Sequence, residues 1–180
     1  MAKPASHRLH PASYPFSAIT QTRFGDMDFL GHLNNVAYAA LFENGRVRFN
    51  RSLDERSLRG KGERWLVAAV EINYLREGHF PDDVEIGSGI GRIGTSSWVI
   101  EQAAFQGGVC IATCDTVLVY QGVDGAAKKE NGHEIAHVGE KSGIWPMMQA
   151  PCQSSFKPPV MRFFIKTTFN AANLLSLRVR

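Results

Sequence analysis

Residues 22–49, TRFGDMDFLGHLNNVAYAALFENGRVRF, connect the end of a strand to a long helix through a polar turn. The turn holds two aspartates, a histidine and two asparagines, and the helix that follows is rich in apolar residues. Asp28, His32, Asn34 and Asn35 are therefore expected beside a helix N-terminus, where free backbone N–H groups and the positive dipole end stabilise negative charge. A carboxylate beside such donors is typical of an acyl-transfer or hydrolysis site.

The helix is expected to begin at Asn34 or Asn35, since either side chain can act as the N-cap. Apolar residues recur along it at helical spacing and cover much of its surface, which indicates a helix enclosed by other structure. The spaced positions are Tyr38, Leu41, Phe42, Gly45 and Phe49. Gly45 costs a helix about 1 kcal/mol relative to alanine unless close backbone packing offsets it.

Four further strands are expected, at residues 65–75, 84–94, 98–105 and 109–120, with Gln106-Gly107-Gly108 as a hairpin turn. In the first of these, alternation puts one set of side chains on the same face: Leu66, Ala68, Val70, Ile72 and Tyr74. Short connections make neighbouring strands antiparallel, and the long helix must cover one face of the sheet. The sequence therefore predicts an α+β domain over residues 16–123, preceded by a flexible arm (1–15) and followed by a poorly ordered or peripherally docked extension (124–180).

Composition excludes several classes of protein. The chain has 180 residues and a net charge of +3, and the excess of basic residues lies from Asp124 onward, which argues against a nucleic-acid-binding face on the domain. No apolar run can cross a bilayer, and the N-terminus lacks the apolar core of a secretory signal. We therefore expect a cytoplasmic protein. Cys110 and Cys114, four residues apart on one predicted strand, are expected to be buried thiols on the same sheet face; Cys152 has no assigned role.

The quoted stretch resembles the signature of the hotdog-fold thioesterases, in the group named for 4-hydroxybenzoyl-CoA thioesterase, through its D-x-D-x-x-G-H-x-N-N spacing ahead of a helix. The likeness continues through WLVAAVEINYLREGHFPDDVEIGSGIGRIGTSSWVIEQAAF (65–105) and covers residues 16–121. It implies a curved antiparallel five-stranded sheet around one central helix, hydrolysis of an acyl-CoA thioester, and dimers or tetramers with sites between subunits. Asp28 matches the family's catalytic carboxylate, and Asn35 falls where a backbone N–H polarises the thioester carbonyl. Relatives usually have an acid and an alanine where this helix has Asn44 and Gly45.

The residues of the turn have competing roles. Asp28 can act as a general base or as a nucleophile, because a thioester needs only one carboxylate and an oxyanion donor. Asp26 is expected to stabilise the turn, and the Asp-x-Asp pair lacks the further ligands of a metal site, so no metal is expected. His32 either orients Asp28 and the thioester or holds the turn through a backbone contact. Glu43, on the helix, is the alternative catalytic carboxylate.

Other residues are expected to contact the substrate. Asn34 and Tyr38 lie at the start of the helix, and Arg92, Thr95, Ser96 and Ser97 form a polar turn that either holds CoA phosphate or pantetheine or is a solvated hairpin. No dinucleotide or phosphate-loop motif is present, so CoA is expected as part of the substrate rather than as a cofactor. Two alternatives stay open, a non-catalytic acyl-CoA-binding module and a hotdog dehydratase or hydratase. After Glu140 the chain has six basic residues and no acidic one, which would suit an anionic membrane surface or CoA phosphates, although a weakly ordered appendage is the default for residues 124–180.

Overall fold

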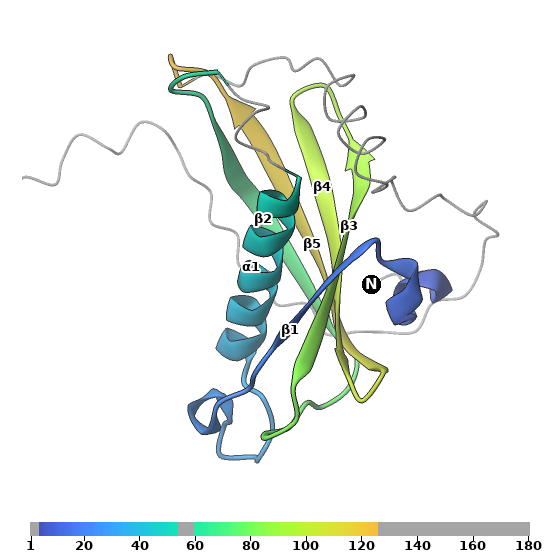
Figure 1. The fold of residues 1–180 in the computed structure, drawn as a ribbon. Helices are drawn as coiled ribbons and strands as arrows, with labels where there is room; N and C mark the ends of the chain where they lie inside the picture. The colour runs from blue at the N-terminus through green and yellow to red at the C-terminus, as the bar shows by residue number, and fades with distance from the viewer. Residues whose placement is uncertain (1–3, 54–59, 126–180) are drawn as a thin grey trace, which may run out of the picture.

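The computed structural model of the chain describes residues 4–53 and 60–125 (Figure 1). The helices are η1 (Ser6–Leu9), η2 (Pro11–Ser13), η3 (Phe24–Asp26) and α1 (Asn35–Ser52). The strands are β1 (Phe16–Thr20), β2 (Arg64–Tyr74), β3 (Val84–Ile93), β4 (Ser97–Gln106) and β5 (Val109–Gln121). None of the helices in these ranges is long and apolar enough to cross a membrane. The predictions for the C-terminal extension beyond residue 125, Cys152 included, lie outside the described residues.

The five strands form one antiparallel sheet in the order β1-β3-β4-β5-β2, and α1 crosses one face of it (Figure 1). We call the face covered by α1 the inner face and the opposite one the outer face. The β4–β5 hairpin closes on Gly107 and Gly108, which both have positive φ (57° and 78°), as the two-residue turn of a twisted hairpin requires. The predicted α+β fold, a five-stranded antiparallel sheet around one long helix, is confirmed.

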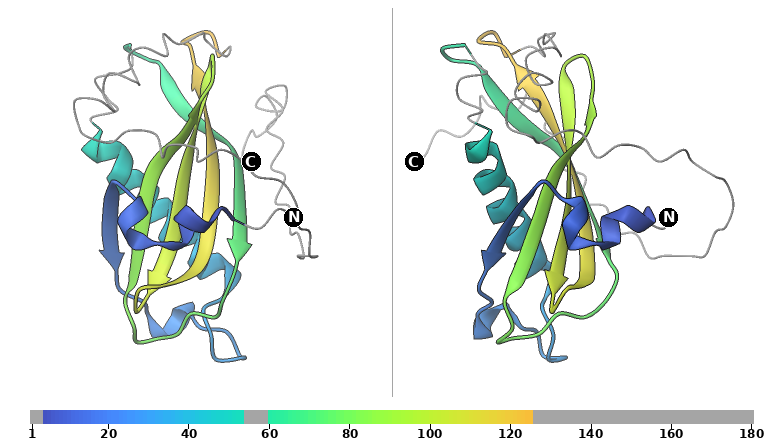
Figure 2. Two further views of the ribbon diagram at one scale, coloured as in Figure 1. Left: turned by 90° about the vertical axis from the view of Figure 1, so that its right-hand side faces the viewer. Right: turned by 45° about the vertical axis from the view of Figure 1, so that its right-hand side comes forward.

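Residues 4–15 are not the loose arm that the sequence suggested. η1 and η2 lie against the outer face of the sheet, on the side away from α1 (Figure 2). The buried guanidinium of Arg8 donates to Asp115 Oδ1 at 2.6 Å and to the carbonyls of Gln102 and Cys114 at 3.3 Å, and Tyr14 donates its hydroxyl to the Arg8 carbonyl. One inserted arginine therefore anchors a segment that has no hydrophobic periodicity of its own.

Two of the three register shifts in the sheet change which faces the predicted side chains occupy. The pairing of β2 with β5 shifts between Val67 and Ala69, so Leu66 lies on the face opposite to Val70, against the prediction that they share one. A second shift, where β4 pairs with β5 at Ala104 and Phe105, likewise separates the two cysteines. Cys110 packs with Tyr14 and Phe105 on the outer face, whereas Cys114 joins the core beneath α1. Both thiols are free and buried, as predicted, and burial raises the pKa of Cys114 to about 12.

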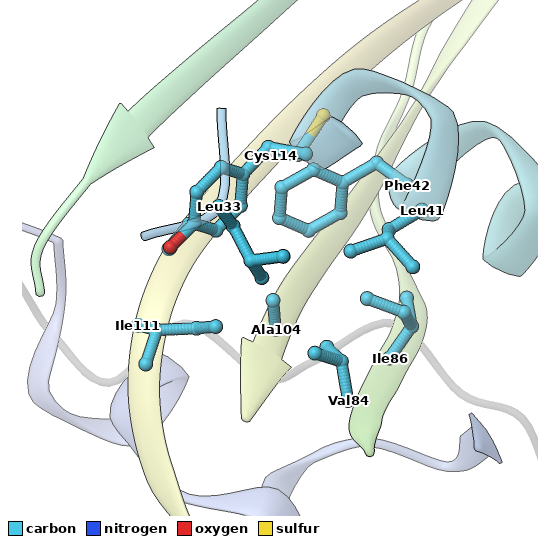
Figure 3. Packing of buried hydrophobic residues seen from close by; sticks show 10 residues of the cluster. Leu33, Leu41, Phe42, Val84, Ile86, Ala104, Ile111 and Cys114 are labelled. Carbon is cyan, nitrogen blue, oxygen red and sulfur yellow. The ribbon is translucent and has the colours of Figure 1, made fainter. Parts of the chain in front are cut away.

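The core between α1 and the inner face divides into two clusters. The first lies beside the start of α1 and includes Leu33, Phe42, Ile86 and Ile111 (Figure 3). The second, which we call the far cluster, lies beside the end of α1 and consists of Phe49, Leu53, Ile90, Trp98, Ile100 and Leu118. Because both ends of the helix are fixed by buried side chains, the position of its N-terminus relative to the sheet is well determined.

Between the two clusters, Gly45 brings α1 close to β3. A Cβ atom at this position would come within 2.4 Å of Ile86 Cγ2 and 3.1 Å of Gln102 Nε2. The buried Gln102 amide also donates to the Phe42 carbonyl at 3.2 Å and to Ser88 Oγ at 3.0 Å. Close packing thus offsets the low helix propensity of glycine, which is the exception that the sequence analysis allowed.

Candidate active site

The polar turn between β1 and α1 is held by its own backbone. Asn34 N–H donates to the Asp26 carbonyl at 2.9 Å, and Met27 pairs with Leu33 in an isolated β-bridge. Inside this loop, Asp28 N–H donates to the His32 carbonyl at 3.0 Å and Gly31 N–H to the Asp28 carbonyl at 3.1 Å. These bonds fold the segment into a tight turn that brings Asp28 and His32 together.

Asp26 fixes the entry to this turn, as predicted. Its carboxylate accepts the Arg23 backbone N–H at 2.8 Å and the Arg23 guanidinium at 2.8 Å. The arginine hydrogen bond, outweighing burial, lowers the pKa of Asp26 below its usual value. Asp26 and Asp28 therefore have different partners. No group of three or more metal-ligating side chains occurs in the described parts of the chain.

The Asp28 carboxylate lies beside His32. Its Oδ1 accepts the Leu30 backbone N–H at 2.8 Å, and its Oδ2 is 3.6 Å from Nδ1 of His32. The two side chains are 27% and 26% exposed, so each is partly shielded and still reachable from solvent. Oδ1 has a structural role in the turn, while Oδ2 and the imidazole remain available to a ligand.

Helix α1 begins directly after the turn. Asn34 is the N-cap, and its side-chain oxygen accepts the Ala37 N–H at 2.8 Å, as one of the two predicted caps. The geometry of a helix leaves the N–H groups of Asn35 and Val36 without an intrahelical acceptor. The positive end of α1 therefore faces the same region as the Asp28 carboxylate.

A pocket of about 500 Å³ opens at this point. It is lined by Asp28, His32, Leu33, Asn35, Tyr38, Tyr74, Leu75, Arg76 and Glu77. One wall comes from the turn and the start of α1, and the other from the end of β2 and the residues that follow it. Three of the predicted catalytic residues and the predicted substrate contact Tyr38 thus meet in one pocket.

Two tyrosines line the pocket together. The rings of Tyr38 and Tyr74 meet edge to face with centroids 5.3 Å apart, and Tyr38 donates its hydroxyl to the Arg76 carbonyl at 3.3 Å. Burial raises the pKa of Tyr38 to about 12 and also raises that of Tyr74. Tyr38 therefore stays protonated at neutral pH and is a hydrogen-bond donor.

Sequence reasoning missed the contribution of β2 to the pocket. The alternation places Tyr74 on a strand face, and no pattern in the sequence marks Arg76 or Glu77. The only signal in the sequence was that Tyr74 shares a face with Ile72, which indicates an inward side chain. That the end of β2 lies beside the start of α1 depends on how the whole sheet is arranged, which local patterns do not contain.

Other predicted site residues lie elsewhere in the chain. Glu43 is two turns further along α1, about 12 Å from Asn35 at 1.5 Å per residue, with its side chain 68% exposed and 3.6 Å from the Arg46 guanidinium. Arg92, Thr95, Ser96 and Ser97 lie around the β3–β4 turn, at the end of the sheet opposite to the polar turn (Figure 1). A single chain does not bring them to the Asp28 pocket.

The sequence and fold are similar to those of several known proteins. The profile described as the thioesterase-like superfamily matches residues 22–149. A predicted thioesterase from Bacillus stearothermophilus is 27% identical with a TM-score of 0.61, and the match covers 73% of this chain and 97% of that one. A thioesterase from Thermus thermophilus, complexed with coenzyme A and Zn, is 28% identical with a TM-score of 0.59, over 73% and 97% of the two chains. A Pseudomonas aeruginosa protein is 27% identical with a TM-score of 0.63, over 79% and 99%. No protein with a curated description matches the sequence.

Proposed function

Since the chain belongs to the thioesterase-like superfamily and is a thioester hydrolase, we propose that it hydrolyses an acyl-CoA to the free acid and CoA. One observation carries this proposal: the Asp28 carboxylate and the first residue of α1 line the same pocket. A carboxylate and unpaired helix amides around one cavity supply the base or nucleophile and the oxyanion donor that thioester hydrolysis needs. CoA enters as part of the substrate, and no cofactor is proposed.

Two routes fit these groups. As a general base, Asp28 takes a proton from water while the water oxygen attacks the thioester carbonyl carbon. As a nucleophile, Asp28 attacks that carbon itself, CoA leaves, and water hydrolyses the resulting anhydride. In both routes the C–S bond breaks, the thiolate takes up a proton, and the backbone N–H groups of Asn35 and Val36 stabilise the oxyanion. His32, 3.6 Å from Asp28, is suited to orienting that carboxylate.

We further propose that the chain works as a homodimer, alone or as half of a tetramer, joined through β2. This strand is at the edge of the sheet, and its inner-facing Val67 and Val70 are exposed. An exposed apolar edge strand is a template for pairing with another strand. Antiparallel pairing of two β2 strands would carry the partner's β3–β4 turn toward the pocket, where Arg92 and its serine and threonine neighbours could meet the CoA phosphates.

The limits of the catalytic unit are part of the same proposal. We assign hydrolysis to residues 16–123 and treat 1–15 and 124–180 as additions to that unit. Support comes from the sheet and helix, which fall within this range, although the family match continues to residue 149.

The test is a panel of acyl-CoA thioesters assayed with a thiol-trapping dye. Wild-type protein is expected to release CoA, Asp28→Ala to lose about three orders of magnitude in kcat, and Glu43→Ala to keep activity within about twofold. Ligand binding is measured in parallel by calorimetry. If wild-type protein binds acyl-CoA without releasing thiol, the chain is a binding module; if Asp28→Ala turns over normally, the catalytic assignment is wrong. Hydration of an enoyl-CoA with the thioester intact would indicate the hydratase.

Sedimentation tests the assembly. Wild-type protein is expected to sediment as a dimer or tetramer, and Val70→Lys as a monomer, because a charge on the inner face of the β2 edge opposes pairing. A monomeric wild type that hydrolyses acyl-CoA at full rate would contradict the dimer.

A further inference from the structure

The connection between β2 and β3, residues 75–83, lies against the polar turn. The Leu33 N–H donates to the Gly78 carbonyl at 2.7 Å, and Thr22 Oγ1 donates to the Asp82 carbonyl at 3.1 Å. A Cβ at Gly78 would come within 3.0 Å of Leu33, Ile111 and Tyr38, so the glycine permits this close approach. The catalytic turn therefore rests on a second segment that is distant in sequence.

Within this connection, the backbone of His79 is held by one side chain. Gln106, at the end of β4, accepts the His79 N–H through Oε1 at 2.9 Å and donates through Nε2 to the His79 carbonyl at 2.7 Å. The same Nε2 also donates to the Asp82 carbonyl at 2.9 Å. The β4–β5 hairpin thus fixes the point from which the imidazole of His79 extends.

That imidazole reaches into the middle of the turn. Its Nδ1 lies 3.1 Å from the carbonyl oxygen of Gly31, between Asp28 and His32. A carbonyl can only accept, so Nδ1 must carry the proton, in the neutral or the charged ring. Gly31 has a φ of 86°, a conformation that favours glycine, and its own N–H donates to the Asp28 carbonyl.

We propose that His79 is a positioning residue that holds the Asp28–His32 turn in its reactive conformation through the hydrogen bond to Gly31. The proposal rests on the proposed function for its catalytic meaning. His79 lies outside the lining of the pocket, although its Nε2 is 4.0 Å from Oε2 of Glu77, an exposed residue of that lining. It acts through Gly31, and Gln106 in turn fixes His79. The His79 side chain is 50% exposed, so water competes for its hydrogen bond to Gly31. Loss of this bond should therefore weaken the turn only modestly.

The experiment compares His79→Asn with His79→Leu in the full chain. An asparagine amide can place a donor where Nδ1 stands, whereas leucine cannot. His79→Leu is expected to lower kcat about three- to tenfold, with KM within about twofold and the melting temperature within about 2 °C of wild type. His79→Asn should restore most of kcat. His10→Leu, in the N-terminal segment, is the matched control and should leave kcat unchanged.

Hydrogen exchange gives a readout that does not depend on activity. The Asp28 and Gly31 amides, both bonded within the turn, should exchange about three- to tenfold faster in His79→Leu than in wild type or His79→Asn. Unchanged kcat and exchange in His79→Leu would overturn the proposal, as would equal losses in both variants or a general fall in melting temperature that explains the lost activity. If wild-type protein hydrolyses no acyl-CoA, the proposed function fails while the exchange rates still decide whether His79 holds the turn.

Discussion

Where α1 begins, the chain forms an irregular polar turn, and where α1 ends it packs into the far cluster of aromatic and aliphatic side chains. Around the beginning, backbone groups are bonded within the turn and to residues 78–79 of the β2–β3 connection, and Asp28 keeps 27% of its side chain exposed. Around the end, Phe49 and Ile100 are completely buried. Both ends belong to one helix, and the first brings the Asp28 carboxylate, unpaired helix amides and a pocket together.

The difference indicates a division of labour along the helix. A reactive carboxylate must meet water and substrate, so its surroundings cannot be closed with apolar side chains, and hydrogen bonds must fix the backbone instead. The far cluster carries no such requirement and can bury its residues fully. We therefore expect substitutions at the far cluster to change stability and substitutions at the turn to change catalysis.

The largest expected effect is at the far cluster. Phe49→Ala should lower the free energy of unfolding by about 3–5 kcal/mol, because it leaves a cavity between α1 and Trp98. Urea unfolding measures this loss of stability. In assays at 15 °C, the folded fraction of the variant should keep the wild-type kcat and KM. Leu33→Ala, a matched truncation at the pocket, should lower both stability and kcat. Equal kcat losses in the two variants, after correction for unfolded protein, would contradict the division.

The middle of the helix gives the next effect. Gly45→Ala would stabilise an exposed helix by about 1 kcal/mol, but here the new methyl meets Ile86 Cγ2, so we expect a net loss of about 1–3 kcal/mol. Thermal unfolding measures the change, and Asn44→Ala, one residue away on the exposed face, is the control. Combining Gly45→Ala with Ile86→Ala should recover part of the loss as a positive coupling; strict additivity would mean that the contact with Ile86 is not the cause.

Local rules explain what the sequence predicted well. The N-cap, narrowed by sequence to Asn34 or Asn35, and the Gly107-Gly108 hairpin each depend on a few neighbouring residues whose side-chain or backbone chemistry leaves few alternatives. Asp28, His32 and Asn35 come together for the same reason, since they lie within eight consecutive residues of one turn. Motif and geometry therefore agree most closely where the sequence separation is smallest.

Non-local pairing explains what the sequence missed. Bulges place Leu66 and Val70 on opposite faces, and likewise Cys110 and Cys114. They depend on how strands pair across the sheet and cannot be recognised in the alternation of a single strand's sequence. Arg8 gives no periodic signal, although it anchors the N-terminal segment to Asp115. The wall formed after β2 joins residues about forty positions apart, and only the assembled sheet brings them to the turn.

A smaller expected effect is that the stability of the polar turn depends on pH through Asp26. The pKa of Asp26 is lowered in the folded chain, so its ionised form adds stability above the ordinary carboxyl pKa of 3.8, and this stability is lost as the pH falls through the lower folded value. Asp26→Asn should therefore cost about 1 kcal/mol at pH 7 and progressively less below pH 3.8. Urea unfolding at several pH values measures the difference, with Asp83→Asn, at an exposed aspartate outside β2, as the control. A difference that persists unchanged at the lowest pH would exclude the charge of Asp26 as its source.

The smallest effect tests whether the β3–β4 turn of one chain meets the Asp28 pocket of another chain. Arg92 lies at the end of the sheet remote from Asp28, and pairing of two β2 strands would bring one chain's Arg92 toward the other chain's pocket. Arg92→Gln should raise KM for an acyl-CoA about three- to tenfold, as expected for one lost contact to a phosphate, without changing kcat. A truncated thioester that lacks the nucleotide should be hydrolysed as before.

Mixing two variants decides whether that contact crosses between subunits. In a mixed dimer of Asp28→Ala and Arg92→Gln chains, the pocket with an intact Asp28 belongs to the Arg92→Gln chain and receives Arg92 from its partner. If Arg92 acts across the interface, the mixture should regain a component of activity with the wild-type KM. If Arg92 acts within its own chain, every active pocket keeps the raised KM, and the proposed contact between one chain's β3–β4 turn and the other chain's pocket is wrong. Unmixed preparations of each variant, carried through the same exchange, provide the baseline.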